Sequence, residues 1–67
     1  MKVEIIERGT DVLLASRDTC MGGFVCPRKN ELIHAGGDTY VVREVKFFYY
    51  DAIGGNNDFV EVLVDAE

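Results

Sequence analysis

Apolar and polar positions alternate over much of this chain, and the strongest pattern lies in its second half. The residues from Thr39 to Tyr50 are mostly β-branched or aromatic, a composition typical of strands. A straight strand of this length would span about 40 Å, which is more than the width of a small domain. The alternation shifts by one position at Arg43–Glu44, which is what a β-bulge produces, so we predict a long strand that bends there. The apolar residues around this shift are Tyr40 and Val42 before it, and Val45, Phe47 and Tyr49 after it.

Three shorter strands are predicted from the same alternation. Lys2–Glu7 forms the first, Glu31–Ala35 precedes the long strand, and Phe59–Val64 follows it. The Gly36-Gly37-Asp38 sequence predicts a tight hairpin turn before the long strand. In the last strand alternate residues face inward or outward, the inward set being Val60, Val62 and Val64 and the outward set Phe59, Glu61 and Leu63.

The part of the chain after the first strand is less regular. A turn signal precedes Val12–Ala15, which reads as a buried strand. A helix over Asp11–Arg17, with Thr10 or Asp11 as its N-cap, is the alternative, although it would be a short one. Further on, Phe24–Cys26 is expected to form a short strand that ends at Pro27, before a polar turn.

These elements predict an all-β fold, a small five-stranded barrel or twisted roll built on a long bent hairpin. The 67 residues allow one domain, residues 1–67, and 48% of them are hydrophobic, enough to form a core. A domain of this size has a thin margin of stability, so each core side chain matters. The predicted core consists of Leu32, Val41, Val45, Val60 and Val62.

The charge of the chain is uneven along its length. The formal net charge is −5. Residues 1–34 carry five cationic and five acidic side chains, whereas residues 35–67 carry two against seven. Direct nucleic-acid binding needs a clustered basic footprint, which this acidic second half disfavours. The excess charge suits a basic partner surface, or serves solubility alone.

The beginning of the sequence predicts a cytoplasmic location. It reads Met1-Lys2-Val3-Glu4, with an acidic residue too early for a signal peptide. No apolar run approaches the length of a membrane-spanning helix. We therefore expect a cytoplasmic protein that does not bind a membrane.

Candidate chemistry is sparse. Cys20 and Cys26 lack the spacing typical of a zinc knuckle, and a full site would need the only histidine, His34, and a carboxylate. In the cytoplasm the two thiols are expected to be reduced and partly buried rather than joined in a disulfide. Cys26 and His34 have no evident third group to orient them as a nucleophilic pair, and the glycine pairs match no phosphate-binding motif. We predict no catalytic residue, no metal and no cofactor, and hence no enzyme.

The consecutive aromatic residues Phe47–Tyr50 are the most informative surface. Two of them must face each side of their strand. One pair can enter the core, whereas the other needs a loop, a second sheet or another chain to cover it. A compact barrel that curls over both faces is the alternative to a partner. The predicted partner-binding residues are Phe48, Tyr50, Phe59 and Leu63.

The order of turns and strands from Pro27 onward forms a pattern. A strand ends in Gly36-Gly37, a Tyr40-Val41-Val42 strand has Val45 three residues further on, and a Val60-x-Val62-x-Val64 strand follows. This pattern resembles the small SH3-like β-barrels that are common in bacterial and bacteriophage proteins. The resemblance implies a barrel and, since such barrels mostly serve as binding or assembly modules, a binding role.

These observations predict a non-enzymatic binding or accessory protein that acts through protein–protein contacts, as a homo-oligomer or as a subunit of a larger assembly. Its size and form suit a phage or mobile-element inhibitor or assembly factor. Two alternatives remain open. One is an oligomer that binds or sequesters an anionic small molecule through Arg17, Arg28 and Lys29. The other is an acidic mimic of nucleic acid.

Overall fold

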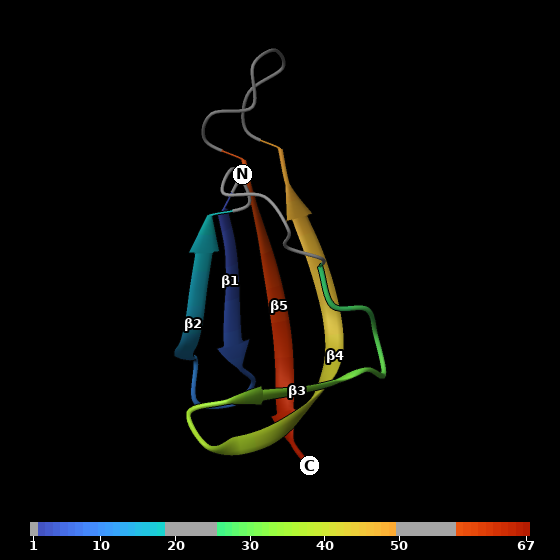
Figure 1. Ribbon diagram of the computed structural model, residues 1–67. Coiled ribbons are helices and arrows are strands. Elements are labelled where there is room, and N and C mark those ends of the chain that lie inside the picture. Colours follow the sequence, from blue (N-terminus) through green and yellow to red (C-terminus); the bar gives the residue numbers. More distant parts are fainter. Residues whose placement is uncertain (1, 19–25, 50–57) are drawn as a thin grey trace.

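The computed structural model describes residues 2–18, 26–49 and 58–67 of the chain. All regular secondary structure in these ranges is β-strand (Figure 1). The five strands are β1 (Lys2–Glu7), β2 (Val12–Asp18), β3 (Leu32–Ala35), β4 (Asp38–Phe48) and β5 (Phe59–Ala66).

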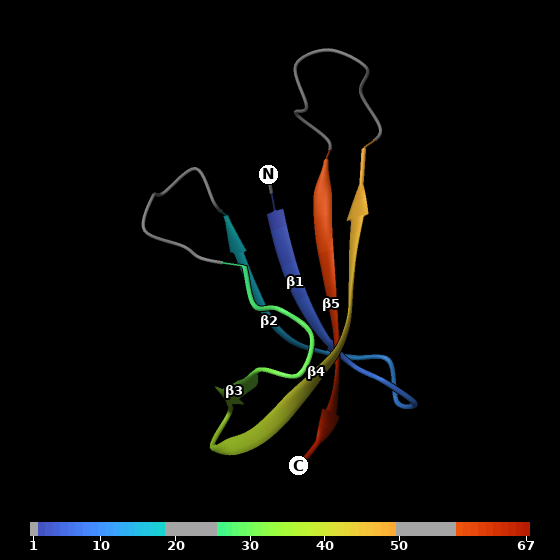
Figure 2. The same cartoon turned by 90° about the vertical axis from the view of Figure 1, so that its right-hand side faces the viewer.

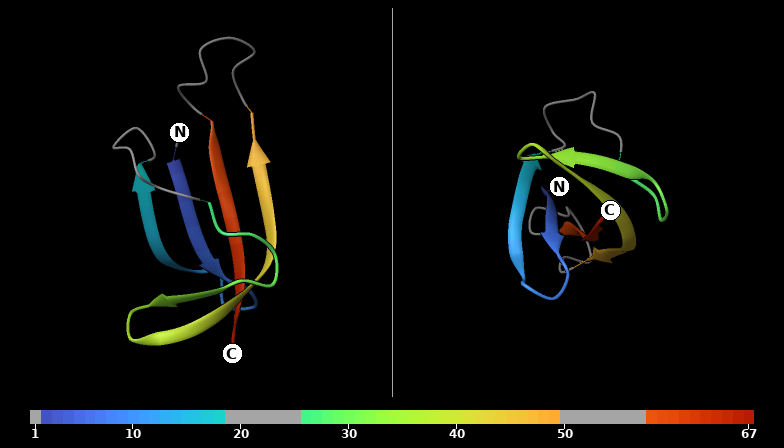
Figure 3. Two further views of the ribbon diagram at one scale, coloured as in Figure 1. Left: turned by 45° about the vertical axis from the view of Figure 1, so that its right-hand side comes forward. Right: turned by 90° about the horizontal axis from the view of Figure 1, so that it is seen from below.

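The strands form one sheet in the order β2-β1-β5-β4-β3. Neighbouring strands are antiparallel except β1 and β5, which run parallel. The sheet curls until β3, at one end of this order, comes back toward β2 at the other, as the end-on view in Figure 3 shows. The described residues therefore form a nearly closed five-stranded barrel, and the predicted all-β class is confirmed.

The connection between β1 and β2 is a tight turn in which Gly9 and Asp11 have positive φ angles of 86° and 56°. The Asp11 amide donates a hydrogen bond to the Glu7 carbonyl oxygen at 3.0 Å, which closes the turn. The chain then continues as β2, so the helical alternative for Asp11–Arg17 is wrong. Pairing of β2 along the whole of β1 outweighs the weak local helix signal of so short a segment.

A two-residue turn joins β3 to β4. Gly36 and Gly37 have φ angles of 60° and 90°, and two consecutive positive φ angles are the signature of a type I′ turn. The twist of this turn matches the twist of the strands that it joins. The predicted hairpin is confirmed, with β3 beginning one residue later than the pattern indicated.

The longest strand, β4, bends strongly along its length (Figure 2). Its register with β5 shifts between Val42 and Glu44, which leaves Arg43 as the extra residue of a β-bulge. Val42 and Val45 consequently lie on the same face, although they are three positions apart, and both pair with inward valines of β5. The predicted bend and its position are confirmed.

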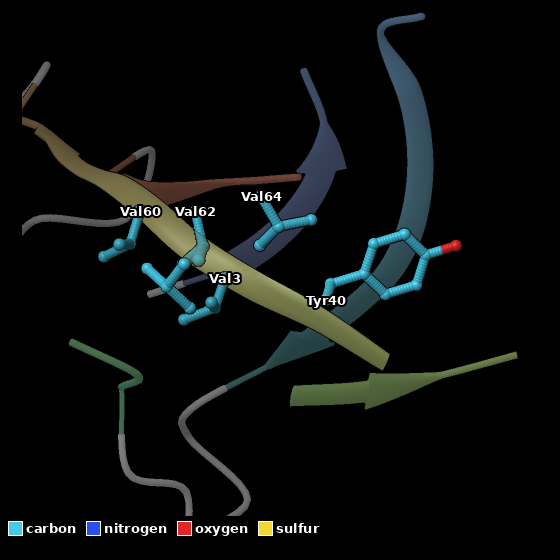
Figure 4. Close-up of a cluster of buried hydrophobic side chains, with 6 residues drawn as sticks. Val3, Tyr40, Val60, Val62 and Val64 are labelled. Carbon is cyan, nitrogen blue, oxygen red and sulfur yellow. The ribbon is translucent and has the colours of Figure 1, made fainter. Parts of the chain in front are cut away.

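A valine-rich core fills the inner face of the barrel (Figure 4). Val60 and Val62 are fully buried and Val45 packs against them, as predicted. The predictions for Leu32 and Val41 are wrong, because these two residues pair with each other on the outer face, where Leu32 is 58% exposed. The prediction gave Val41 and Val45 the same phase, whereas the bulge puts them on opposite faces. The buried core residues are Val3, Tyr40, Val42, Val60, Val62 and Val64.

Some predicted elements fall outside the described ranges. Phe24 and Val25 of the expected short strand lie outside them, and Cys26 belongs to no strand. Most of the predicted loop over residues 51–58 also lies outside. Within the described ranges, no helix is long and apolar enough to cross a membrane.

Candidate binding site

A basic pocket lies beside β4, at the point where the chain before β3 leaves the sheet. Its volume is about 700 Å³, which is within the usual range for ligand pockets. One wall comes from residues 26–29, and the other from the part of β4 that follows Val42. The described residues that line this basic pocket are Cys26, Pro27, Arg28, Lys29 and the run Arg43–Phe47.

Backbone hydrogen bonds before β3 explain why the pocket opens. The Asn30 amide donates a hydrogen bond to the Val42 carbonyl oxygen at 2.8 Å, and the Val42 amide donates one to the Glu31 carbonyl oxygen at 2.9 Å. Residues 28–31 form a turn just before this point of the chain. In it the Glu31 amide donates to the Arg28 carbonyl oxygen at 3.1 Å, and Asn30 has a φ of 75°. Pro27, next to this turn, has no amide hydrogen to add to the ladder. The chain therefore separates from β4 and leaves a gap.

The pocket lies at the edge of β4 rather than over one of its faces. Side chains of a strand alternate between the two faces, so a pocket over one face touches every second residue. Here all consecutive residues from Arg43 to Phe47 line the pocket. From Glu44 onward their other edge pairs with β5, and the β3–β4 register ends before them at Val41. Among the described residues, no strand pairs with Arg43–Phe47 on the pocket side.

Most of the cationic side chains of this acidic chain gather at the pocket. Four of the seven lysine and arginine residues of the chain line it, and Glu44 supplies the one carboxylate among the described lining residues. The Nζ atom of Lys46 lies 3.6 Å from Oε2 of Glu44, so this carboxylate is already paired. The four cationic residues are Arg28, Lys29, Arg43 and Lys46.

These cationic side chains differ in whether a carboxylate of the protein pairs with them. Nε of Arg43 donates to Oδ2 of Asp65 at 3.0 Å, and Nη1 of Arg8 lies 3.7 Å from the same oxygen. Arg28 and Lys29 are exposed, and no carboxylate in the described part of the chain forms an ion pair with either side chain. Arg28 and Lys29 are therefore available to an anionic group.

Apolar side chains complete the pocket. Val45 and Phe47 belong to the inner face, because they pair with Val62 and Val60. Phe47 is nevertheless 54% exposed, and its ring stacks on that of Tyr49 with centroids 6.4 Å apart. An exposed aromatic ring next to cationic groups offers a bound molecule apolar contact as well as charge.

Cys26 lines the pocket as a partly buried free thiol. Burial and, to a smaller extent, the carboxylate of Glu31 raise the pKa of this thiol above its ordinary value of 9.0. A raised pKa lowers the thiolate fraction at neutral pH, which disfavours a nucleophilic or metal-binding role. Nδ1 of His34 lies 2.9 Å from Oγ1 of Thr39, and within the described ranges no cluster of three metal-ligating side chains occurs. Cys20 lies outside these ranges, and the absence of enzymatic activity stays a prediction.

Two of the three predicted anion contacts, Arg28 and Lys29, meet in the basic pocket. The third, Arg17, lies on β2, donates from Nη1 to the carbonyl oxygen of Ser16 at 2.7 Å, and does not line the pocket. Sequence reasoning missed Arg43 and Lys46 as members of the site. The only signal that pointed toward them was the phase shift of β4, because a bulge bends its strand and re-aims the side chains around it.

The predicted partner-binding residues of the described chain lie on the outer face. Phe48 and Phe59 pair across β4 and β5, and their rings stack with centroids 4.5 Å apart. We call Phe48 and Phe59 the outer aromatic pair. The fourth predicted residue of this surface, Tyr50, lies outside the described ranges.

Leu63 lies on the same face in an apolar row that crosses three strands. It pairs with Ile6 of β1, which pairs with Leu13 of β2. Glu61 separates this apolar row from the outer aromatic pair, because it lies between Phe59 and Leu63 on the outward side of β5. The partner-binding role of these residues stays a prediction.

Comparison of the chain with known protein families, curated proteins and solved structures found no match. Its function therefore has to be inferred from the basic pocket and the outer face themselves.

Proposed function

We propose that this chain is a non-enzymatic binding module that acts through protein contacts and takes an acidic segment of a partner protein into the basic pocket. One observation carries the proposal: four of the seven cationic side chains, in a chain of net charge −5, line a single pocket. The small five-stranded barrel agrees with the SH3-like resemblance, and barrels of that type mostly serve as binding modules.

The distribution of charge favours an acidic ligand. Most of the remaining charged side chains are carboxylates, so an acidic partner is repelled by much of the surface and attracted at the pocket. Such a local reversal of sign steers a partner to one place and one orientation, and contributes more to specificity and association rate than to affinity. Because Arg28 and Lys29 have no ion pair within the described ranges, they can meet partner carboxylates without breaking an internal contact.

The composition of the pocket favours a peptide over a small anion. A small anion needs the cationic groups alone, whereas Val45 and the exposed ring of Phe47 add apolar surface to the same pocket. A polypeptide that carries both carboxylates and apolar side chains uses both features. The anionic small molecule remains the competing ligand, and the experiment below separates the two.

Self-association is a second candidate function, and the outer face is the observation that favours it. The outer aromatic pair and the apolar row of Leu63, Ile6 and Leu13 lie on one side of a single curled sheet, and Leu13 is 51% exposed. A second copy of the chain would cover this surface in a two-fold arrangement, which is the commonest one for identical chains. The nucleic-acid mimic is less well supported, because the basic pocket interrupts the acidic surface that a mimic needs.

Binding of a fluorescein-labelled peptide, followed by anisotropy, tests the proposed function. The probe alternates glutamate with valine, and a matched peptide carries glutamine in place of glutamate. We expect the acidic peptide to bind more tightly, and its advantage to shrink as the ionic strength rises from about 0.01 M to about 0.15 M, since the Debye length falls from roughly 30 Å to roughly 8 Å.

Two double variants of the protein with the same change in charge locate the site. Arg28→Glu with Lys29→Glu changes the pocket, and Lys2→Glu with Arg17→Glu changes cations that do not line it. The pocket variant should weaken binding by at least about tenfold, or about 1.4 kcal/mol, and the control variant by much less. Equal loss in both variants, or equal affinity for the two peptides, overturns the proposal. Full displacement of the peptide by inorganic pyrophosphate near its own dissociation constant would instead identify a small-anion site.

A further inference from the structure

We propose that the partner segment binds the basic pocket as an added β-strand, which pairs with the edge of β4 at Arg43–Phe47 and alternates acidic with apolar side chains. This inference rests on the proposed function and specifies how the same site takes its ligand. Its basis is the position of the pocket, which follows a strand edge that no described residue pairs.

The backbone supplies the first part of the case. Every residue of Arg43–Phe47 carries an amide hydrogen and a carbonyl oxygen, and along a strand alternate residues direct these groups to opposite edges. From Glu44 onward, one edge of this stretch pairs with β5. Toward the pocket, the β3–β4 register stops at Val41, and the last backbone hydrogen bonds that described residues form on that side are those of Val42. The groups directed into the pocket can therefore accept and donate hydrogen bonds to an incoming chain, as in β-augmentation.

The other open edges of the sheet are less suitable. The outer edge of β3 is only four residues long, and β2 is turned toward β3 at the seam of the barrel (Figure 3). β2 carries a single cationic side chain, Arg17, and does not line the basic pocket. In the described part of the chain, the stretch Arg43–Phe47 combines an edge that no other strand pairs, a pocket beside it and a cluster of cationic residues.

The wall opposite β4 keeps the hollow open. Residues 26–29 line it, but the turn around Asn30 has already carried them away from β4, and Pro27 lacks an amide hydrogen. A stretch of five residues extends for roughly 17 Å. The pocket volume of about 700 Å³ is of the size that holds a short extended segment rather than a folded domain.

The side chains of β4 predict the pattern of the partner. On the inner face Val45 and Phe47 would lie beside alternate side chains of an added strand, and apolar residues suit these positions. On the outer face Lys46 would lie beside the side chains between them, and opposite charge stabilises such neighbours. Arg28 and Lys29 add positive charge from the other wall. The expected partner segment therefore alternates carboxylate with apolar residues, with main-chain bonds supplying affinity and side chains specificity.

Backbone methylation of the probe separates strand pairing from simple charge attraction. Two versions of the glutamate–valine peptide carry N-methyl groups either on all glutamate amides or on all valine amides. Both keep every charge and every side chain. Only one of the two sets of amides can point toward β4, so one version should bind at least about tenfold more weakly than the unmethylated peptide, and the other within about twofold of it.

Two measurements on the protein complete the test. Amide hydrogen exchange, followed by nuclear magnetic resonance, should slow at least about tenfold at alternate residues of Arg43–Phe47 when the peptide is bound. Phe47→Ala should weaken the peptide several-fold, whereas the same change at its neighbour Phe48, on the outer face, should leave binding unchanged. Each variant is first checked for an unchanged circular dichroism spectrum, and a Phe48→Leu variant replaces the control if Phe48→Ala unfolds.

The possible results distinguish this inference from the proposed function. If both methylated peptides bind as well as the parent while charge and salt dependence persist, strand addition is overturned and the proposed function stands. If the acidic peptide shows no preference for the pocket, both are overturned. If the same amides of β4 become protected as the concentration of the protein alone is raised, a second copy occupies the edge, and the assignment to a partner segment is wrong.

Discussion

Two neighbouring valines of β4 provide the sharpest test of the fold. Val42 is 0% exposed in the core, whereas Val41 is partly exposed on the outer face opposite Leu32. Val42→Ala and Val41→Ala remove the same atoms from adjacent positions of one strand. The loss of intrinsic strand preference is therefore similar in the two variants, and the difference between their stabilities reports burial.

The expected magnitudes follow from that difference. Removal of two buried carbon groups costs about 0.8 kcal/mol for each. A cavity in so small a valine core adds to this, so Val42→Ala should lower the free energy of unfolding by about 2–3 kcal/mol. Val41→Ala should lower it by about 1 kcal/mol or less. A domain of 67 residues has a total stability on the order of 3–10 kcal/mol, so the first variant loses a large share and the second a small one.

Urea unfolding followed by circular dichroism measures both variants, and the method suits a chain that has no tryptophan. Equal m-values for the two variants and the wild type would show that only stability has changed. Equal losses of stability, or a larger loss for Val41→Ala, would refute the inward position of Val42, which pairs with the buried Val64 of β5.

Three further predictions concern a turn, a thiol and the outer face. Gly37→Ala should lower the free energy of unfolding by about 1–2 kcal/mol in the same experiment, because a side chain disfavours the φ of 90° at this position. No atom lies within 4 Å of the added carbon, so a steric clash does not contribute to the loss. Unchanged stability would contradict this backbone conformation. Burial and, to a smaller extent, the carboxylate of Glu31 raise the pKa of the Cys26 thiol in the folded protein. The stability that the protonated thiol contributes is therefore fully present below the ordinary pKa of 9.0, and it is lost as the pH rises through the higher pKa of the folded state. Cys26→Val should therefore lose less stability than the wild type between neutral pH and pH values above 9.0, and parallel losses would argue against the shift. If the outer face joins copies of the chain, Phe48→Asp or Tyr50→Asp should dissociate the assembly in sedimentation at micromolar concentration, because a buried unpaired charge costs several kcal/mol; a wild-type protein that sediments as a monomer would exclude self-association.

Much of the strand content was predictable because it depends on local pattern. The β-branched and aromatic run of β4, the paired glycines of its turn and the alternating valines of β5 each carry their own signal over a few residues. The phase shift at Arg43–Glu44 likewise predicted the bulge, since an extra residue displaces every later side chain to the other face. The helical alternative for Asp11–Arg17 could not be excluded locally, because a short apolar segment fits a strand or a helix until a partner strand pairs with it.

The basic pocket, by contrast, exists only in the tertiary structure. Its cations come from two separate segments of the chain, and no local pattern indicates that they meet. Arg28 and Lys29 precede β3, whereas Arg43 is the bulge residue of β4 and Lys46 follows it. The same holds for the core: Val41 and Val42 are equivalent in sequence, and only pairing with β3 and β5 decides which one is buried. Local sequence determines whether a segment is extended, because backbone and side-chain preferences act within a few residues. Which edges are paired and which remain open depends on neighbours distant in the chain, and at the edge of β4 that is what creates the candidate site.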